Sequence, residues 1–231
     1  MTAAIEWQVL WPALLAGLVV LATHVPLGQE VLKRGIVFID LALAQVAVLG
    51  VIAAEVLGFE AHGFAVQAIA VGAALAGAAL LAWSERRFAA QQEALIGSLF
   101  VVAASAALLL LHRDPHGAEH LRDVLEGQIL WAEPGAVLVA AVASVAVLAL
   151  WFGVARSRAR LFYPLFALSV TLAVQLVGVY LVFASLILPA LAVSRLRGRR
   201  LVHGYVLGAL AYAAGLPLSL ATDLPAAPTP R

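Results

Sequence analysis

The sequence predicts an all-α, polytopic integral membrane protein with seven to eight transmembrane or re-entrant helices. Of its 231 residues, 64% are hydrophobic and only 12% are charged, and the mean hydropathy is +1.03. A soluble domain is roughly 45–50% apolar and about 25% charged, so this composition excludes an ordinary water-soluble fold. The chain has no cysteine, which removes disulfides and thiolate metal ligands from consideration.

Apolar runs separated by short polar breaks mark the expected helices. Each of the first five is close to the roughly 20 helical residues that cross a hydrocarbon core about 30 Å thick. The first run has neither a basic leader nor a small-residue cleavage motif, so we expect a retained span. These five runs cover approximately residues 7–25, 35–58, 64–83, 94–111 and 135–154.

The sixth run, residues 163–193, is too long for one crossing. As a single helix it would measure about 46 Å, which exceeds even a tilted span. We expect it to break or turn back between Gly178 and Pro189, because proline removes a backbone hydrogen bond and glycine allows unwinding. A last run covers about 203–221. The sequence therefore predicts one membrane domain, residues 1–222, and a short Pro-rich C-terminal tail, residues 223–231.

Positive charge is concentrated in four loops. Loops rich in lysine and arginine tend to stay in the cytoplasm. If residues 163–193 cross the membrane and return, all four loops lie on one face and the N-terminus lies outside; a single crossing would put the most basic loop on the wrong face. The basic residues are Lys33 and Arg34; Arg86 and Arg87; Arg156, Arg158 and Arg160; and Arg195, Arg197, Arg199 and Arg200.

Two carboxylates lie in the second run, where a charge at lipid depth is expensive. Asp40 follows Arg34 by about a turn and a half, and Glu55 lies near the opposite interface. Glu55 is expected to reach water. Asp40 either forms an ion pair or a cap with Lys33, Arg34 or a neighbouring helix, or it lines the pathway of a cation.

Gln45 is also at membrane depth, where amides most often join helices by hydrogen bonds. It follows Asp40 by five residues, which is about 140° around a helix. The two side chains therefore do not share one face closely, and a joint cation site would need a wide cavity or a local distortion.

The polar segment from His112 to His120 is the richest source of candidate metal ligands. Asp114 followed by Pro115 is typical of a helix start. A helix from this point places His116, His120 and Asp123 on one face, a spacing that can present two imidazoles and a carboxylate to a zinc-like ion. The alternative is that these side chains are simply solvated. The charge topology places this loop outside.

The sequence gives little support for an enzyme. No Walker-type phosphate loop is present, so nucleotide hydrolysis by this chain is not expected. A membrane protease would need a serine paired with a base. Serines such as Ser169 lie in apolar runs, but His24 and His203 are placed at run ends, at the interfaces. The net charge of +1 gives no reason to expect a nucleic-acid partner.

Two segments resemble motifs of the zinc/manganese-type permeases of ATP-binding cassette importers, of which this chain would be a divergent, short member. Residues 35–50, GIVFIDLALAQVAVLG, resemble the second-helix motif, and residues 177–192, VGVYLVFASLILPALA, are similar to the late motif of that family. The family histidine falls on Gln45, and Asp40 precedes the position of the family aspartate by one residue. Residues 94–97 also fit the opening of the fourth helix.

The resemblance implies a permease subunit that takes zinc or manganese from an extracytoplasmic metal-binding protein and couples to cytoplasmic ATPases. We expect it to work as a dimer in a bacterial inner membrane, with Asp40 and Gln45 lining the path and His116, His120 and Asp123 receiving metal. No resident cofactor is expected. Two alternatives remain: an ATPase-independent carrier or channel that moves ions with protons through Asp40 and Glu55, and a membrane scaffold that transports nothing.

Overall fold

The computed structural model describes residues 2–59, 63–112, 129–154, 158–196 and 198–222, and this part of the chain consists of helices joined by short connections. The predicted all-α fold is therefore confirmed, and strands are absent from these residues. Short 3-10 turns, η1 (Ala89–Gln91) and η2 (Ile129–Trp131), precede α4 and α6. The α-helices are α1 (Thr2–Arg34), α2 (Ile39–Val56), α3 (Phe64–Arg87), α4 (Gln92–Leu111), α6 (Pro134–Gly153), α7 (Arg158–Val177), α8 (Val179–Ala192) and α9 (Arg200–Thr222).

Six of these helices, α1, α2, α3, α4, α6 and α9, are long and apolar enough to cross a membrane. The apolar parts of α7 and α8, Leu161–Val177 and Val179–Ala192, are shorter. At about 1.5 Å per residue, the 14 residues of α8 rise about 21 Å, which is less than the thickness of a hydrocarbon core. The count agrees with the expected seven to eight membrane-embedded segments.

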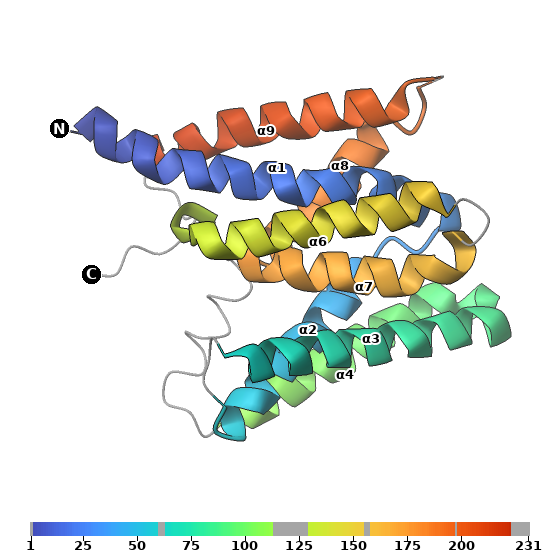
Figure 1. Ribbon diagram of the computed structural model, residues 1–231. Coiled ribbons are helices and arrows are strands. Elements are labelled where there is room, and N and C mark those ends of the chain that lie inside the picture. Colours follow the sequence, from blue (N-terminus) through green and yellow to red (C-terminus); the bar gives the residue numbers. More distant parts are fainter. Residues whose placement is uncertain (1, 60–62, 113–128, 155–157, 197, 223–231) are drawn as a thin grey trace.

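The long sixth run breaks at Gly178. This residue has φ 78° and ψ 165°, a backbone region that is essentially restricted to glycine. In Figure 1, α7 and α8 run in opposite senses along the bundle. Pro189 does not interrupt the helix, since α8 continues past it to Ala192. The run therefore reverses direction as expected, and Gly178 makes the turn.

The helix ends beside the four basic loops lie together. Figure 1 shows the C-terminal ends of α1, α3, α6 and α8, and the N-terminal ends of α2, α7 and α9, at one end of the bundle. The start of α1 and the end of α9 lie at the opposite end. We refer to the first as the basic end. By the charge rule it faces the cytoplasm.

Helix α1 is longer than its apolar run predicted. It continues from residue 25 to Arg34 and contains Pro12 and Pro26. Membrane helices tolerate internal proline because neighbouring helices satisfy the freed backbone groups. The extension places His24 ten residues before the helix end, well inside the span. The expectation that His24 lies at an interface was wrong.

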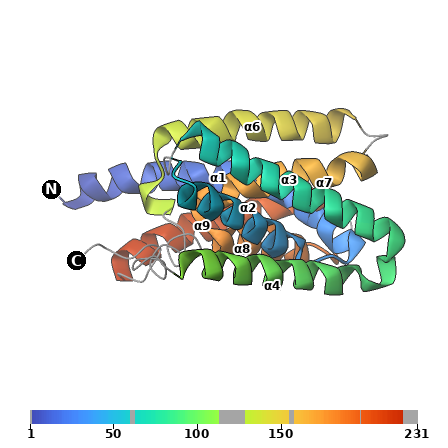
Figure 2. The ribbon, with the colours of Figure 1, turned by 90° about the horizontal axis from the view of Figure 1, so that it is seen from below.

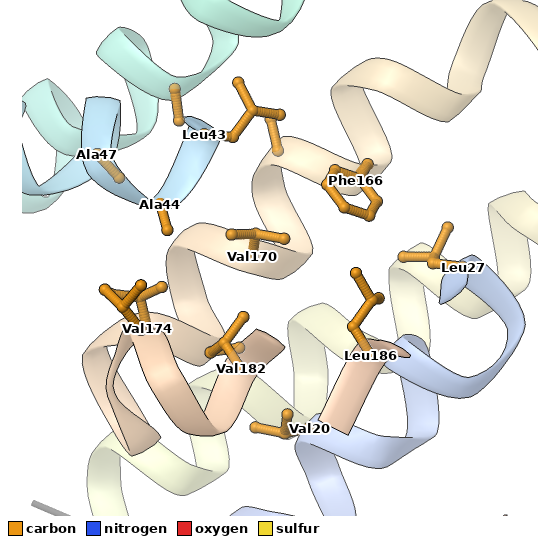
Figure 3. Close-up of a cluster of buried hydrophobic side chains, with 14 of the residues drawn as sticks. Val20, Leu27, Leu43, Ala44, Ala47, Phe166, Val170, Val174, Val182 and Leu186 are labelled. Atoms are coloured by element: carbon orange, nitrogen blue, oxygen red, sulfur yellow. The ribbon is translucent and has the colours of Figure 1, made fainter. Parts of the chain in front are cut away.

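Helix α2 is mostly buried, and Val56 at its end is its one exposed residue. It packs mainly against α3 and α4 and also contacts α7 and α8. Figure 2 shows α4 and α6 on opposite outer sides of the bundle. Figure 3 shows Leu43, Ala44 and Ala47 of α2 turned toward Val170 and Val174 of α7, beside side chains of α1 and α8. Small residues at such contacts let helix backbones approach, which is how membrane helices associate.

We expect substitution of Gly28 by alanine to destabilise the fold. A Cβ at this position would overlap the backbone carbonyl oxygen of Leu186, so α1 and α8 would have to move apart. Overpacking of this kind costs about 1–3 kcal/mol. Thermal unfolding of Gly28→Ala in detergent should therefore show a lower midpoint than the parent protein.

Gly72→Ala is the matched control. A Cβ at Gly72, an exposed position in α3, meets no heavy atom within 4 Å. Alanine in an open helical position is favourable by about 1 kcal/mol, so this variant should be as stable as the parent or slightly more so. Equal midpoints for the two variants would contradict the tight α1–α8 crossing.

Candidate functional site

Asp40 is the most unusual polar residue of the described bundle. It occupies the first turn of α2 at the basic end, and 1% of its surface is exposed. Both carboxylate oxygens are buried without a hydrogen-bond partner of good geometry. The backbone N–H groups of Asp40 and Leu41 are the donors that act on its charge. The positive end of the α2 dipole therefore gives this carboxylate partial support only.

The basic side chains nearest to Asp40 in the sequence, Lys33 and Arg34, form ion pairs with other carboxylates. Arg34 bonds Glu30 through Nε and Oε1 at 3.0 Å, and Glu85 through Nη1 and Oε1 at 3.4 Å. Its guanidinium also lies 4.3 Å from the ring centre of Phe162. Lys33 pairs with Glu30 at 3.8 Å. The alternative in which Asp40 forms an ion pair with Lys33 or Arg34 is therefore not what the structure contains.

Glu93 is a second carboxylate at this site, and the sequence reasoning missed it. It lies in the first turn of α4, and its Oε1 accepts a hydrogen bond from the backbone N–H of Phe38 at 3.2 Å. Its Oε2 is buried without a partner. Phe38 lies two residues before Asp40, so the two carboxylates lie beside the same first turn of α2. In the sequence, Glu93 resembles any acidic residue at the start of a span; only the fold brings it to Asp40.

Gln45 is buried as well, with 2% of its surface exposed. Because α2 is one continuous helix over Ile39–Val56, Gln45 lies about 7.5 Å further along the axis and about 140° around it from Asp40. Ala44, one turn after Asp40, is the residue that shares its face. Gln45 therefore remains a candidate for another part of the path.

A second polar group joins α1 to α7 inside the span. The Ser169 hydroxyl donates to Thr23 Oγ1 at 2.6 Å, and Thr23 Oγ1 lies 3.2 Å from Nδ1 of His24. His24 is completely buried, and its Nε2 has no partner. Because Ser169 bonds threonine and not histidine, the group lacks the serine–base pair of a protease. Its evident role is to hold the two helices together.

Two cavities lie near buried hydroxyl groups of the bundle. A cavity of about 10 Å³ lies beside Thr23, Ser144 and Ser169 and is about the size of one water molecule. A much larger one, about 710 Å³, lies between α8 and α9 and is mainly apolar. In its wall, the hydroxyls of Ser185 and Tyr212 are 2.7 Å apart. Asp40 lines neither cavity, so in this conformation its carboxylate is closed off from both.

The predicted ligands His116, His120 and Asp123 lie outside the described residues. Within the residues that are described, no three histidine, aspartate or glutamate side chains gather closely enough to hold a metal ion. Asp40 and Glu93 are only a pair. The predicted outer metal site thus remains a prediction, and the pair at the basic end is the arrangement that the structure provides.

The chain matches known proteins by family and by fold. A sequence model described as the ABC 3 transport family matches residues 6–158 and 156–229. No curated protein has a significant sequence match. The fold is similar to that of PsaBC from Streptococcus pneumoniae, solved in complex with a Fab, with a TM-score of 0.74, 20% identity, and coverage of 94% of this chain and 84% of that one.

A second solved structure has a similar fold. It is described as an inward-facing conformation of a metal-chelate type ABC transporter. The TM-score is 0.69 and the identity 14%, and the match covers 92% of this chain and 77% of that one. At these identities the two likenesses establish the arrangement of the helices.

We expect Arg34→Gln to lower the stability of the bundle. Glu30 and Glu85 would lose a partly buried partner, since the Arg34 side chain is only 14% exposed, and an unsatisfied group of this kind costs about 1–3 kcal/mol. Thermal unfolding in detergent should show a lower midpoint. Lys33→Gln is the control, because Lys33 is 78% exposed and a surface ion pair contributes about 0–1 kcal/mol. Equal losses would contradict the bridging role of Arg34.

Proposed function

Since the family match spans nearly the whole chain, the chain belongs to the ABC 3 transport family, and from that premise we propose that it conducts a divalent transition-metal cation, zinc or manganese. It is a multi-pass membrane permease of an ABC transporter. It is the membrane subunit and not itself an enzyme, so ATP is hydrolysed on a separate chain. The proposal concerns the ion, the residues that meet it and the assembly around them.

The observation that carries the proposal is the unpaired carboxylate of Asp40. A charged side chain inside a membrane is costly, and such residues usually mark an ion or substrate pathway. The basic side chains closest in sequence are bound to Glu30 and Glu85, which leaves Asp40 available to a transported cation. Carboxylate oxygens exchange metal readily, and a conducting site must release its ion as well as bind it.

The positions of the helix ends suggest how the subunit is arranged. We place the ATPase at the basic end, where α6 ends and α7 begins, and the extracytoplasmic binding protein at the opposite end, beside the loop with His116, His120 and Asp123. Asp40 and Gln45 would face the path formed by two copies of the permease in a bacterial inner membrane. Because Asp40 is closed off in this conformation, the path must open by a movement of the helices around it.

Family membership favours this function over the two alternatives. An ATPase-independent carrier would use Asp40 and Glu55 for protons, and a scaffold would use its polar residues only to join helices. Glu55 has an interaction within the described structure, whereas the Asp40 carboxylate lacks a hydrogen-bond partner of good geometry and is supported only by backbone N–H groups of its own helix turn. The two carboxylates of α2 therefore have different surroundings, and this difference supports a cation path through Asp40.

We expect Asp40→Asn to abolish most metal uptake while the protein is made at normal levels. The amide keeps the shape of the side chain but removes the charge that attracts the cation. Uptake of radioactive manganese and zinc by cells that carry the complete transporter measures the effect. Glu55→Gln is the matched control, with uptake close to that of the parent. Normal uptake by Asp40→Asn at normal expression would rule out the pathway role.

The partner subunit can be tested by isolation of the full-length chain from native membranes in mild detergent. We expect an ATP-binding cassette ATPase to co-purify in near-equal amount, as mass spectrometry would report. A permease that is intact and folded but reproducibly lacks the ATPase would instead support an autonomous carrier or a scaffold.

A further inference from the structure

We propose that Glu93 of α4 and Asp40 of α2 together form a two-carboxylate site for a hard divalent cation such as manganese. The site would be the last one that the ion occupies before it leaves at the basic end. This inference rests on the proposed function, because it names the second ligand of the same path. It differs from the sequence-based expectation, in which the partner of Asp40 is Gln45.

Burial is the first argument. Three carboxylate oxygens of these two residues, Oδ1 and Oδ2 of Asp40 and Oε2 of Glu93, are buried without a hydrogen-bond partner. Buried polar atoms in folded proteins almost always have partners, and exceptions call for an explanation such as an absent ion. A cation shared by both side chains would satisfy all three oxygens at once.

Charge is the second argument. Glu93 accepts a hydrogen bond from the backbone N–H of Phe38, two residues before Asp40, so both carboxylates lie beside the first turn of α2, and two like charges at close range are unfavourable unless something neutralises them. Arg34 and Lys33 hold Glu30 and Glu85 instead. Among the described residues, the remaining positive charge at this site comes from the N-terminal ends of α2 and α4, each of which carries about half a charge. A divalent cation supplies what the protein does not.

The site is also linked to the rest of the bundle. Glu93 is partly exposed, whereas Asp40 is not, so Glu93 lies nearer the surface than Asp40. Phe38, whose N–H bonds Glu93, is 50% exposed, and its ring stacks on Phe183 of α8 at 6.2 Å. A movement of α8 would therefore reach the residue that holds Glu93 in place.

The donor atoms indicate the kind of ion. Carboxylate oxygens suit magnesium, calcium and manganese, whereas imidazole suits zinc and copper. Neither α2 nor α4 contains a histidine, and Gln45 stands where the family motif has one. Of the two proposed cargo ions, manganese is the one whose usual ligands match a site made of Asp40 and Glu93.

The test is manganese binding to the full-length permease, purified with its ATPase and followed by the loss of the electron paramagnetic resonance signal of free Mn²⁺. The variants are Glu93→Gln and Asp40→Asn, with Glu55→Gln as the control. Glutamine at position 93 can still accept the hydrogen bond from Phe38, so this variant removes the charge and keeps the local structure. Elution of a single sharp peak on size exclusion confirms that each variant is folded.

We expect Glu93→Gln and Asp40→Asn each to weaken manganese binding by at least about tenfold, since even the loss of a supporting group beside a metal costs 10–100-fold. Glu93→Asp, which keeps the charge on a shorter arm, should lie between Glu93→Gln and the parent. Glu55→Gln should bind like the parent.

The outcomes separate this inference from the proposed function. Parental binding by Glu93→Gln, together with a loss in Asp40→Asn, would overturn the role of Glu93 and leave the path through Asp40 intact. Parental binding and uptake by Asp40→Asn would overturn both. If Glu93→Gln failed to fold, the intermediate affinity expected of Glu93→Asp would still decide the question, because parental binding by that variant would also contradict a ligand role.

Discussion

The ion pairs of Arg34 with Glu30 and Glu85 determine much of what this bundle can do. They tie the end of α1 to the end of α3, and the guanidinium also lies against Phe162 of α7. These contacts fix three helices at the basic end, where bilayer and cytoplasm would meet. They also engage Arg34, the arginine nearest to Asp40 in the sequence, with other carboxylates. Stability and the availability of Asp40 thus depend on the same arginine.

Small residues and polar residues contribute to helix packing in different ways. Small residues let the helices approach: Gly28 faces the backbone of α8, and Gly208 of α9 faces Leu21 of α1. Polar residues such as Thr23 and Ser169 add hydrogen bonds across helices. In a bilayer, where the hydrophobic effect does not draw helices together, packing and such bonds provide the association. Asp40 and Glu93 differ from the polar helix contacts because three of their carboxylate oxygens are buried without a hydrogen-bond partner, and this difference is the reason to propose that they meet a transported ion.

Sequence reasoning found those parts of the protein that depend on local composition. Apolar runs located the spans, and the excess length of residues 163–193 revealed the turn at Gly178, since length and backbone freedom can both be read along the chain. The positions of the basic residues along the chain likewise predicted that the four basic loops lie on one face of the membrane domain. Sequence reasoning missed the extension of α1, and therefore the burial of His24. The last part of this helix, from Pro26 to Arg34, contains several polar residues, so the apolar run ends before the helix does. Sequence reasoning also missed Glu93, since the residue that faces Asp40 comes from a helix that begins more than fifty positions later.

The place of Asp40 along α2 has an electrical consequence. Asp40 is in the first turn of an 18-residue span, so an ion that reaches it from the opposite face has traversed nearly the whole hydrocarbon core. It has then also traversed nearly the whole transmembrane voltage, which is worth about 2.3 kcal/mol per elementary charge for each 100 mV. For a doubly charged ion this amounts to about 4.6 kcal/mol. In the proposed path, the occupancy of Asp40 would therefore depend on the voltage of an energised membrane as well as on the concentration of the ion, and a de-energised membrane would fill the site less.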